Sequence, residues 1–155
     1  MSDDAVLAGV KKFNEDLEVA SRQVLPHEFR NFISFIALTL ADLIIDKNPV
    51  GNSDNWIRKP KERYVGGRSR GNWQVTVNHP TEQVIDTIDA NGTKTKMNAK
   101  AVIATQVTDD NAIGSVIYIG NNVPYIIPLE NGHSKTQTPN GMVKVSLAEV
   151  RSMFP

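Results

Sequence analysis

Three histidines, two adjacent aspartates and a segment rich in Gly and Arg are the groups of this chain that could do chemistry. His27, His79 and His133 lie far apart, and none sits in the His-Glu-x-x-His spacing of zinc enzymes. His133 follows Glu130 by three residues, a spacing that occurs among metal ligands. Gly132 lies between them, however, and no further acidic cluster accompanies the pair. We therefore expect a polar turn here and no metal site.

The segment 66–71, Gly-Gly-Arg-Ser-Arg-Gly, combines bare backbone donors with two arginines, which suits anions. Its spacing matches neither the phosphate-binding Gly-x-x-x-x-Gly-Lys-Ser/Thr loop nor the Gly-x-Gly-x-x-Gly of dinucleotide sites. Asp109 and Asp110 lie in a turn-rich run, which favours a solvated loop over a catalytic carboxylate pair. The chain has no cysteine, which excludes thiolate nucleophiles, thiolate metal ligands and disulfides. The sequence thus predicts no catalytic residue, no cofactor and no enzyme activity.

The composition predicts one globular domain over residues 1–155. Hydrophobic residues make up 40% and charged residues 22%, so the chain can bury an ordinary core. The 17 basic residues balance the 17 acidic ones, so no overall field draws the chain to nucleic acid or to an anionic membrane. The longest apolar stretch, 29–45, is interrupted by polar residues and predicts a buried helix instead of a membrane span. The acidic start at Met1 is unlike a signal peptide.

The pattern of apolar residues in the first half of the chain predicts two helices. Ser2, Asp3 and Asp4 offer N-cap oxygens to the first helix. Its apolar stripe consists of Val6, Val10, Phe13, Leu17 and Ala20. The second helix is expected to begin at Pro26 and to end near Lys47, because the Asn48-Pro49 dipeptide disfavours helix. Its apolar face consists of Phe29, Phe32, Ile33, Ile36, Leu40, Leu43 and Ile44. We expect the aromatic residues to pack in the core, with a lipid or cofactor groove as the alternative.

Residues 48–71 form the least regular stretch and the most basic one. Pro and Gly recur throughout it, which predicts a loop. Its basic side chains are Arg58, Lys59, Lys61, Arg63, Arg68 and Arg70. A loop of this length in a compact domain is more typical of a functional loop than of a linker. Trp56 and Tyr64 within it suggest an aromatic-anchored arm that docks on a neighbour, with a merely solvated loop as the alternative.

The second half predicts a small sheet with further helices. Strands are expected at 73–77 and 115–119, with possible extended segments at 83–88 and 125–127. The Asn-Gly pair at 91–92 predicts a turn. A helix, or alternatively a strand, follows Asn98, and a short helix is expected within 142–154. The fold class is therefore α+β, with N-terminal helices packed on a small mixed or antiparallel sheet.

Two long motifs resemble a known family. The first is Asn48-Pro-Val50 followed by Gly67-Arg-Ser-Arg-Gly-Asn-Trp73. The second is Asn122-Val-Pro-Tyr-Ile-Ile-Pro-Leu-Glu-Asn-Gly-His-Ser134 followed by Pro139-Asn-Gly-Met-Val143. Together they are similar to the minor tail-component, or tail-completion, proteins of long-tailed bacteriophages, over about 29–154. The chain departs from that pattern at Asn48, where the family usually has Thr, and in an insertion of about a dozen residues that contains Trp56 and Tyr64.

The resemblance implies a structural virion protein of the phage neck, assembled in the host cytoplasm. It implies a homo-oligomeric ring, a hexamer or a dodecamer, that completes the tail and joins it to the head. The neighbours would be head-completion proteins and tail-tube or terminator proteins. A tail terminator that caps the tube and a channel protein that contacts genomic DNA transiently are the alternatives; no membrane contact is expected. The third class, an enzyme using Glu130 and His133, has no other support in the sequence.

The candidate interface residues follow from the basic loop and from the motifs. They are Trp56, Arg58, Tyr64, Arg68, Arg70, Trp73, Tyr125, Glu130 and His133. We expect Tyr125 to bury its ring with its hydroxyl paired. Glu130 is expected to cap a turn or to pair with Arg68 or Arg70. Gly132 and Gly141 are expected at positive φ.

Overall fold

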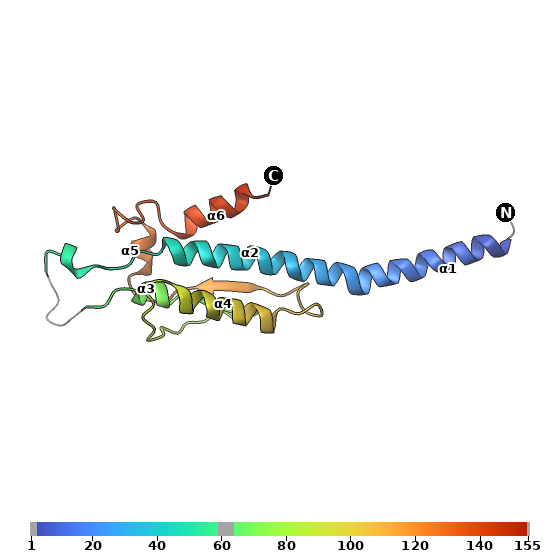
Figure 1. Cartoon of the computed structure of the whole chain (residues 1–155), viewed down its shortest axis with the longest axis horizontal. Coiled ribbons are helices and arrows are strands. Elements are labelled where there is room, and N and C mark those ends of the chain that lie inside the picture. The colour runs from blue at the N-terminus through green and yellow to red at the C-terminus, as the bar shows by residue number, and fades with distance from the viewer. Residues whose placement is uncertain (1–2, 59–63, 155) are drawn as a thin grey trace.

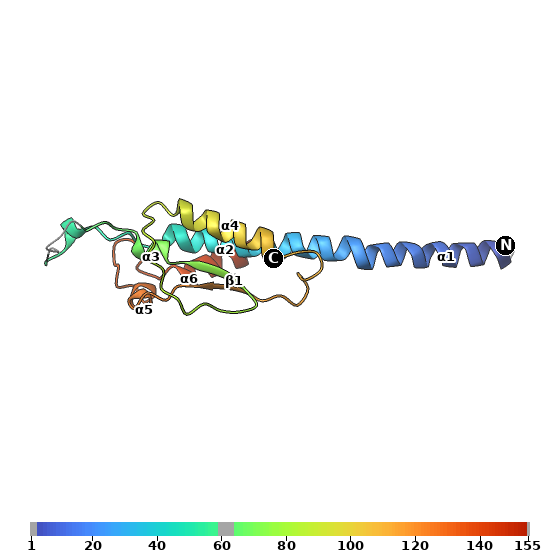
Figure 2. The same ribbon diagram turned by 90° about the horizontal axis from the view of Figure 1, so that it is seen from below.

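The dominant feature is a helical rod that extends well beyond the rest of the molecule (Figures 1 and 2). The computed structural model describes residues 3–58 and 64–154. In it, α1 (Asp3–Val19), the π-helical turn η1 (Ala20–Val24) and α2 (Leu25–Lys47) form one continuous helix. The expected end near Lys47 is confirmed, whereas the expected break between two helices is wrong. Ser2, one of the expected N-cap residues, lies outside the described residues.

The π-helical turn accounts for the continuity of the rod through Pro26. A proline inside an α-helix lacks a donor, and its ring clashes with the carbonyl four residues earlier. Here the backbone N–H of Leu25 donates to the carbonyl of Ala20, a hydrogen bond that spans one residue more than an α-helical one. The widened turn immediately before Pro26 thus accommodates the ring without ending the helix.

Most of the remaining elements pack along α2 and confirm an α+β fold, whereas the loop that carries residues 53–55 projects beyond its end (Figure 1). Strands β1 (Gln74–Val77) and β2 (Ile117–Gly120) pair antiparallel, with Gln74 opposite Gly120 and Val77 opposite Ile117. The other helices are η2 (Ser53–Asn55), α3 (Arg68–Gly71), α4 (Thr93–Gln106), α5 (Ile126–Glu130) and α6 (Val143–Ser152). Both predicted strands and the C-terminal helix are confirmed.

Three of the expectations for the second half are wrong in detail. Residues 83–88 form no strand, because Asn72 and not a neighbouring strand accepts the backbone N–H of Ile85, at 2.8 Å. Residues 126–130 form the short helix α5 instead of a returning strand. The helix expected after Asn98 begins five residues earlier, at Thr93, since the cap lies in the preceding Asp89–Gly92 turn.

Two clusters of buried side chains form the core. The first joins α2, α4 and β1, and its alanines let the two helices approach closely; it consists of Ala37, Ala41, Val75, Ala99, Ile103, Val107 and Ala112. The second lies at the C-terminal end of α2 and consists of Ile44, Ile45, Trp73, Val123, Ile126 and Met142. An ion pair of 2.8 Å between Lys47 and Glu149 also ties α6 to α2. The fold is therefore best packed at the end of the rod farther from the N-terminus.

The expected burial of the helical aromatic residues is wrong for much of the rod. Phe13 lies in α1, and Phe29 and Phe32 lie in the first half of α2; all three are exposed. The edge-to-face contact between Phe32 and Phe154, with ring centroids 5.6 Å apart, covers Phe32 only in part. Before Ala37, α2 meets other segments only through partly exposed contacts, such as the ion pairs of Asp109 with His27 and Arg30, and its fully buried residues begin at Ala37. No helix of the described residues is both long enough and apolar enough to cross a lipid bilayer.

We expect an enlarged side chain at Ala41 to destabilise the fold. Ala41 has no exposed surface and lies between α2 and its neighbours, so the extra methylenes of an Ala41→Leu variant would force packed side chains apart. The free energy of unfolding should fall by about 1–3 kcal/mol in chemical denaturation. Ala104→Leu, on the exposed face of α4, is the matched control and should change little. Equal effects of the two substitutions would contradict this packing.

Candidate functional site

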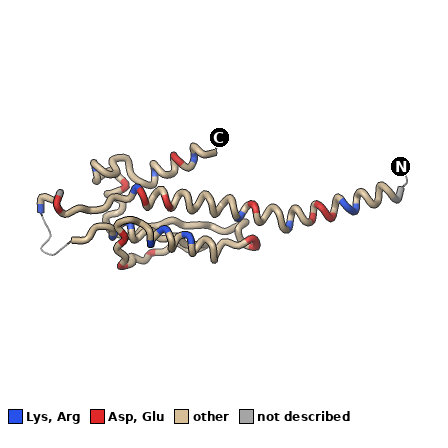
Figure 3. Tube along the Cα trace, in the orientation of Figure 1, with Lys and Arg blue, Asp and Glu red and all other residues tan. Residues whose placement is uncertain are grey.

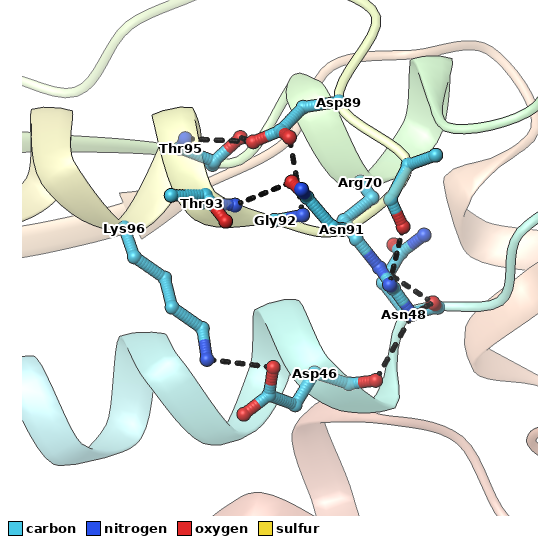
Figure 4. Close-up of polar contacts among 10 residues, drawn as sticks. Asp46, Asn48, Arg70, Asp89, Asn91, Gly92, Thr93, Thr95 and Lys96 are labelled. Atoms are coloured by element: carbon cyan, nitrogen blue, oxygen red, sulfur yellow. Dashed lines mark hydrogen bonds and ion pairs between the residues drawn. The ribbon is translucent and has the colours of Figure 1, made fainter.

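Arg70 closes the C-terminal end of α2 (Figure 4). Its Nε and Nη2 donate to the carbonyl oxygen of Asn48 at 3.1 and 2.6 Å, and Nη2 also donates to the carbonyl of Asp46 at 3.1 Å. Its Nη1 donates to the carbonyl of Ala90 at 2.6 Å. The last carbonyls of a helix have no partner within the helix, and a planar cation with several donors satisfies them well. Arg70 therefore ties the end of α2 to the turn before α4.

The side chain of Asn48 organises the other side of the same helix end. Asn48 is fully buried, and its Oδ1 accepts hydrogen bonds from Ser69 Oγ at 3.0 Å and from Trp73 Nε1 at 2.8 Å. Its Nδ2 donates to the carbonyl of Pro49 at 3.0 Å. One amide side chain thus satisfies the indole of a core tryptophan and fixes the single-turn helix α3. The resembled family usually has Thr at this position. The Asn48 of this chain has both an acceptor, Oδ1, and an amide donor, Nδ2, and both are hydrogen-bonded.

Asp89 holds the beginning of α4 (Figure 4). Its Oδ1 accepts the backbone N–H of Gly92 at 3.1 Å, and its Oδ2 accepts both the backbone N–H and the hydroxyl of Thr95, each at 2.8 Å. Burial alone would raise the pKa of Asp89, but these hydrogen bonds, with one from the backbone of Lys94, hold it below its usual value. An ion pair of 2.6 Å between Lys96 and Asp46 then joins α4 to α2.

Amide side chains in and around the second motif bond to the backbone of distant segments. Asn121 Nδ2 donates to the carbonyl of Ser69 at 2.8 Å, and Asn122 Nδ2 donates to the carbonyl of Thr81 at 2.8 Å. Further along, the amide of Gln137 both donates to and accepts from the backbone of Val50, at 3.1 and 3.0 Å. Segments separated by 41 to 87 positions in the chain are therefore held together by side-chain-to-backbone bonds.

Glu130 caps the beginning of α6. Its Oε2 accepts the backbone N–H groups of Met142 and Val143 at 2.8 and 2.9 Å, and its Oε1 accepts that of Lys144 at 3.0 Å. A carboxylate at a helix N-terminus satisfies unpaired donors and interacts favourably with the helix dipole. Of the two expected roles, the cap is confirmed, and the described contacts contain no pair with either arginine. Gly132 and Gly141 both adopt the expected positive φ, and a side chain at Gly141 would collide with Glu130.

These anchored segments enclose a cavity of about 670 Å³ beside the end of α2. It lies between the 49–69 loop and the 125–137 segment. Five of the expected interface residues line it: Trp56, Tyr64, Arg68, Tyr125 and His133. Its volume falls in the range of small-molecule or peptide-anchor sites. We call it the aromatic pocket.

Aromatic rings form much of the wall of the aromatic pocket. Trp56 and Tyr64 lie against each other, with ring centroids 4.7 Å apart and planes inclined by 51°. Tyr125 stays 42% exposed, so its expected burial is wrong, and the described contacts include no hydrogen bond from its hydroxyl. Burial of the hydroxyl and the nearby Tyr64 raise the pKa of Tyr125, and Arg68 opposes them only in part. Tyr125 therefore remains a neutral donor that faces the pocket.

The charge of the aromatic pocket is positive. Arg68 and Lys135 line it, and no carboxylate does so among the described residues. Anionic groups and flat or apolar groups are therefore the chemistry that this pocket can bind. Lys135 and Gln137 were not expected from the sequence, since neither lies within the resembled motifs.

The other expected interface residues lie outside the aromatic pocket. Arg58 is exposed beyond its wall, whereas Arg70, Trp73 and Glu130 are committed to contacts within the chain. The basic side chains within 59–63 lie outside the described residues. The sequence did not predict the structural roles of Asn48 and Asp89, although Asp89 precedes an Asn-Gly turn and a Thr in the way that many capping carboxylates do.

Glu130 and His133 do not form a catalytic pair in this structure. Both oxygens of Glu130 are engaged by the backbone of α6, and His133 faces the aromatic pocket. Within residues 3–58 and 64–154, no three His, Asp or Glu side chains come together in a way that would hold a metal ion.

We expect Asn48→Ala to be strongly destabilising. The substitution leaves the indole N–H of Trp73 and the hydroxyl of Ser69 buried without an acceptor, which should lower the free energy of unfolding by about 2–4 kcal/mol. Tryptophan fluorescence during denaturation would report it directly. Asn98→Ala, at an exposed position within α4, should leave stability unchanged or slightly raised. A loss of less than about 1 kcal/mol at Asn48 would contradict the role assigned to its side chain.

Asp89 should give the protein a measurable sensitivity to acid. Its pKa is lower in the folded than in the unfolded chain, so its stabilising contribution is complete above the unfolded value of about 3.9. That contribution is lost as the pH falls through the folded value. Asp89→Asn should cost about 1–2 kcal/mol at neutral pH. The variant should also lose less stability than the wild type between neutral pH and about pH 3. Parallel stability curves for the two proteins would overturn this assignment.

Comparison with protein-family profiles, with curated proteins and with solved structures gave no match to this chain. The resemblance to the tail-component proteins therefore rests on the two motifs themselves. Their residues form the helix-end contacts, the cap of α6 and most of the aromatic pocket.

Proposed function

We propose that this chain is a structural subunit of the neck of a long-tailed bacteriophage. In this role it forms a homo-oligomeric ring that completes the tail and joins it to the head. Its partners are further copies of itself and the adjoining head-completion and tail-tube or terminator proteins. The tail terminator is the nearest alternative, because the same motifs and the same architecture would serve a ring that caps the tube.

The observation that carries the proposal is the convergence of the two resembled motifs around one pocket. Pro49, Gly67 and Arg68 from the first motif and Tyr125, Leu129 and His133 from the second line the same cavity. Part of the wall is held by side chains that bond to backbone, such as Asn121 to Ser69 and Gln137 to Val50. A pocket of aromatic and basic residues suits the capture of an anchor from a neighbouring protein.

The uncovered apolar residues of α1 support the same proposal. Val6, Phe13 and Leu17 are all more than half exposed on an element that projects from the body (Figure 1). Contiguous exposed apolar residues are typical of surfaces that another protein covers. A chain with a pocket at one end and an uncovered helix at the other has two different surfaces for neighbours, which a closed ring requires.

A DNA-contacting role is the second candidate, since Arg68 and Lys135 in an aromatic pocket could also receive a phosphate and a base. Against it, basic and acidic residues are interspersed along the rod, and no continuous basic stripe follows it (Figure 3). Dedicated DNA binding would give an affinity that falls steeply with salt. The affinity for a protein partner that binds in the aromatic pocket would depend mainly on the aromatic rings that line it.

A variant of the aromatic pocket tests the proposal. Trp56→Ala with Tyr125→Ala removes two exposed rings and should leave the fold intact, but it should weaken partner docking by more than about 2 kcal/mol. We expect the wild type to restore head–tail joining to particles that lack this chain, and the variant to restore it at least about tenfold less well. Tyr118→Ala, an exposed ring on β2, is the matched control and should be active.

Native mass spectrometry of the same samples would detect the ring. A protein that stays monomeric, alone and with heads or tail tubes, and restores no joining would contradict the neck role. Salt-dependent DNA binding that is lost in the pocket variant, without any effect on joining, would favour the second candidate.

A further inference from the structure

Within residues 3–58 and 64–154, no element covers the exposed apolar side of α1. In both views α1 extends clear of the body (Figures 1 and 2). The side chains of Val6, Val10, Phe13 and Leu17 remain between 51% and 64% exposed. We define these four residues as the α1 seam, and we propose that α1 helices of adjacent copies of this chain pack in parallel through it.

The spacing of the α1 seam favours a second helix as its occupant. The steps between successive seam residues are four, three and four, and with the next step of three, to Ala20, apolar residues recur every 3.5 residues on average from Val6 to Ala20. This repeat keeps a narrow apolar line facing one partner helix, and the interlocking geometry of coiled coils requires it. Ala20 continues the line by a further step of three.

The charges of α1 favour an identical copy. Lys11 pairs with Glu15 at 3.9 Å, Lys12 with Asp16 at 3.3 Å, and Arg22 with Glu18 at 3.0 Å, all within the same helix. Three basic and three acidic residues therefore balance over residues 5–24, so two copies can approach along that span without net like-charge repulsion. An anionic membrane would instead require an excess of Lys and Arg on the polar side.

A partner would also stabilise α1. In proteins most helical stability comes from tertiary packing of an apolar face, and no element of the described residues packs on that face of α1. Gly9 within α1 lowers its helix propensity by roughly 1 kcal/mol relative to Ala. Pairing through the α1 seam would bury apolar surface and order the helix in one step.

The parallel orientation rests on the proposed ring. Where α1 lies along the ring axis, rotation brings the equivalent helices of neighbouring copies side by side in the same direction. The pairing of α1 helices itself does not depend on that ring. The α1 contact can therefore fail while the ring stands, and the experiment below separates the two.

The absence of cysteine from the chain permits a direct test. Single variants Val6→Cys, Phe13→Cys and Leu17→Cys are oxidised, and the cross-linked dimers are counted; Ala8→Cys, on the opposite side of α1, is the control. In a parallel pair each seam position faces its own equivalent, close enough for a disulfide. We expect dimers at all three seam positions and few at Ala8.

Each other result overturns the inference in a recognisable way. Cross-linking of Val6→Cys with Leu17→Cys in a mixture, without same-residue dimers of either, indicates antiparallel pairing and overturns the parallel arrangement. An oligomer in native mass spectra with no seam cross-link means that α1 docks elsewhere, and it leaves the ring intact. A monomer without cross-links overturns the pairing and also counts against self-assembly of the ring.

A charged variant gives an independent measurement. Phe13→Asp with Leu17→Asp places two carboxylates in the α1 seam and should raise the protein concentration at half-assembly by at least about tenfold. Ala8→Asp should leave that concentration nearly unchanged. Fluorescence of the buried Trp73 should be the same in both variants, because α1 lies apart from the core. Unchanged assembly of the seam variant would overturn the inference.

Discussion

The last carbonyl groups of α2 must be satisfied where the helix enters the core, and Arg70 and Asn48 together meet that constraint. The guanidinium of Arg70 binds the carbonyls of Asp46 and Asn48, and the amide of Asn48 binds Ser69 and the indole of Trp73. Both are largely inside the molecule, so their bonds are costly to break. The position of α3, the direction of β1 and the turn into α4 all follow from this junction.

The junction explains why the molecule differs so strongly between its two ends. Around the end of α2, the segments are fixed by side-chain bonds to backbone, and a cavity of aromatic and basic residues lies between them. At the other end, no part of the chain that the structure describes packs on α1, whose apolar residues stay in water. A chain built in this way presents one pocket and one helix with an uncovered apolar side.

Much of the secondary structure could be predicted because its signals are local. The rod ends at the Asn48-Pro49 dipeptide, as expected, and alternating apolar and polar residues predicted both strands. Five of the expected interface residues line one pocket. The prediction failed where the outcome depended on distant segments. The Pro26 signal for a helix start was overridden by a π-helical turn, and the 125–127 segment became a helix. Phe29 and Phe32 were expected in the core, but the rod is fully buried only from about Ala37 onward.

The sequence by itself determined the α+β class, the positions of the main helices and strands, and the positive φ of Gly132 and Gly141. These depend on periodicity and on backbone preferences that act over a few residues. Only the tertiary structure decided that Asn48, Arg70 and Glu130 serve helix ends, and which apolar stripe is covered. A polar side chain or an apolar stripe acquires its role from partners far away in the chain, and no local pattern specifies which partner will be nearby.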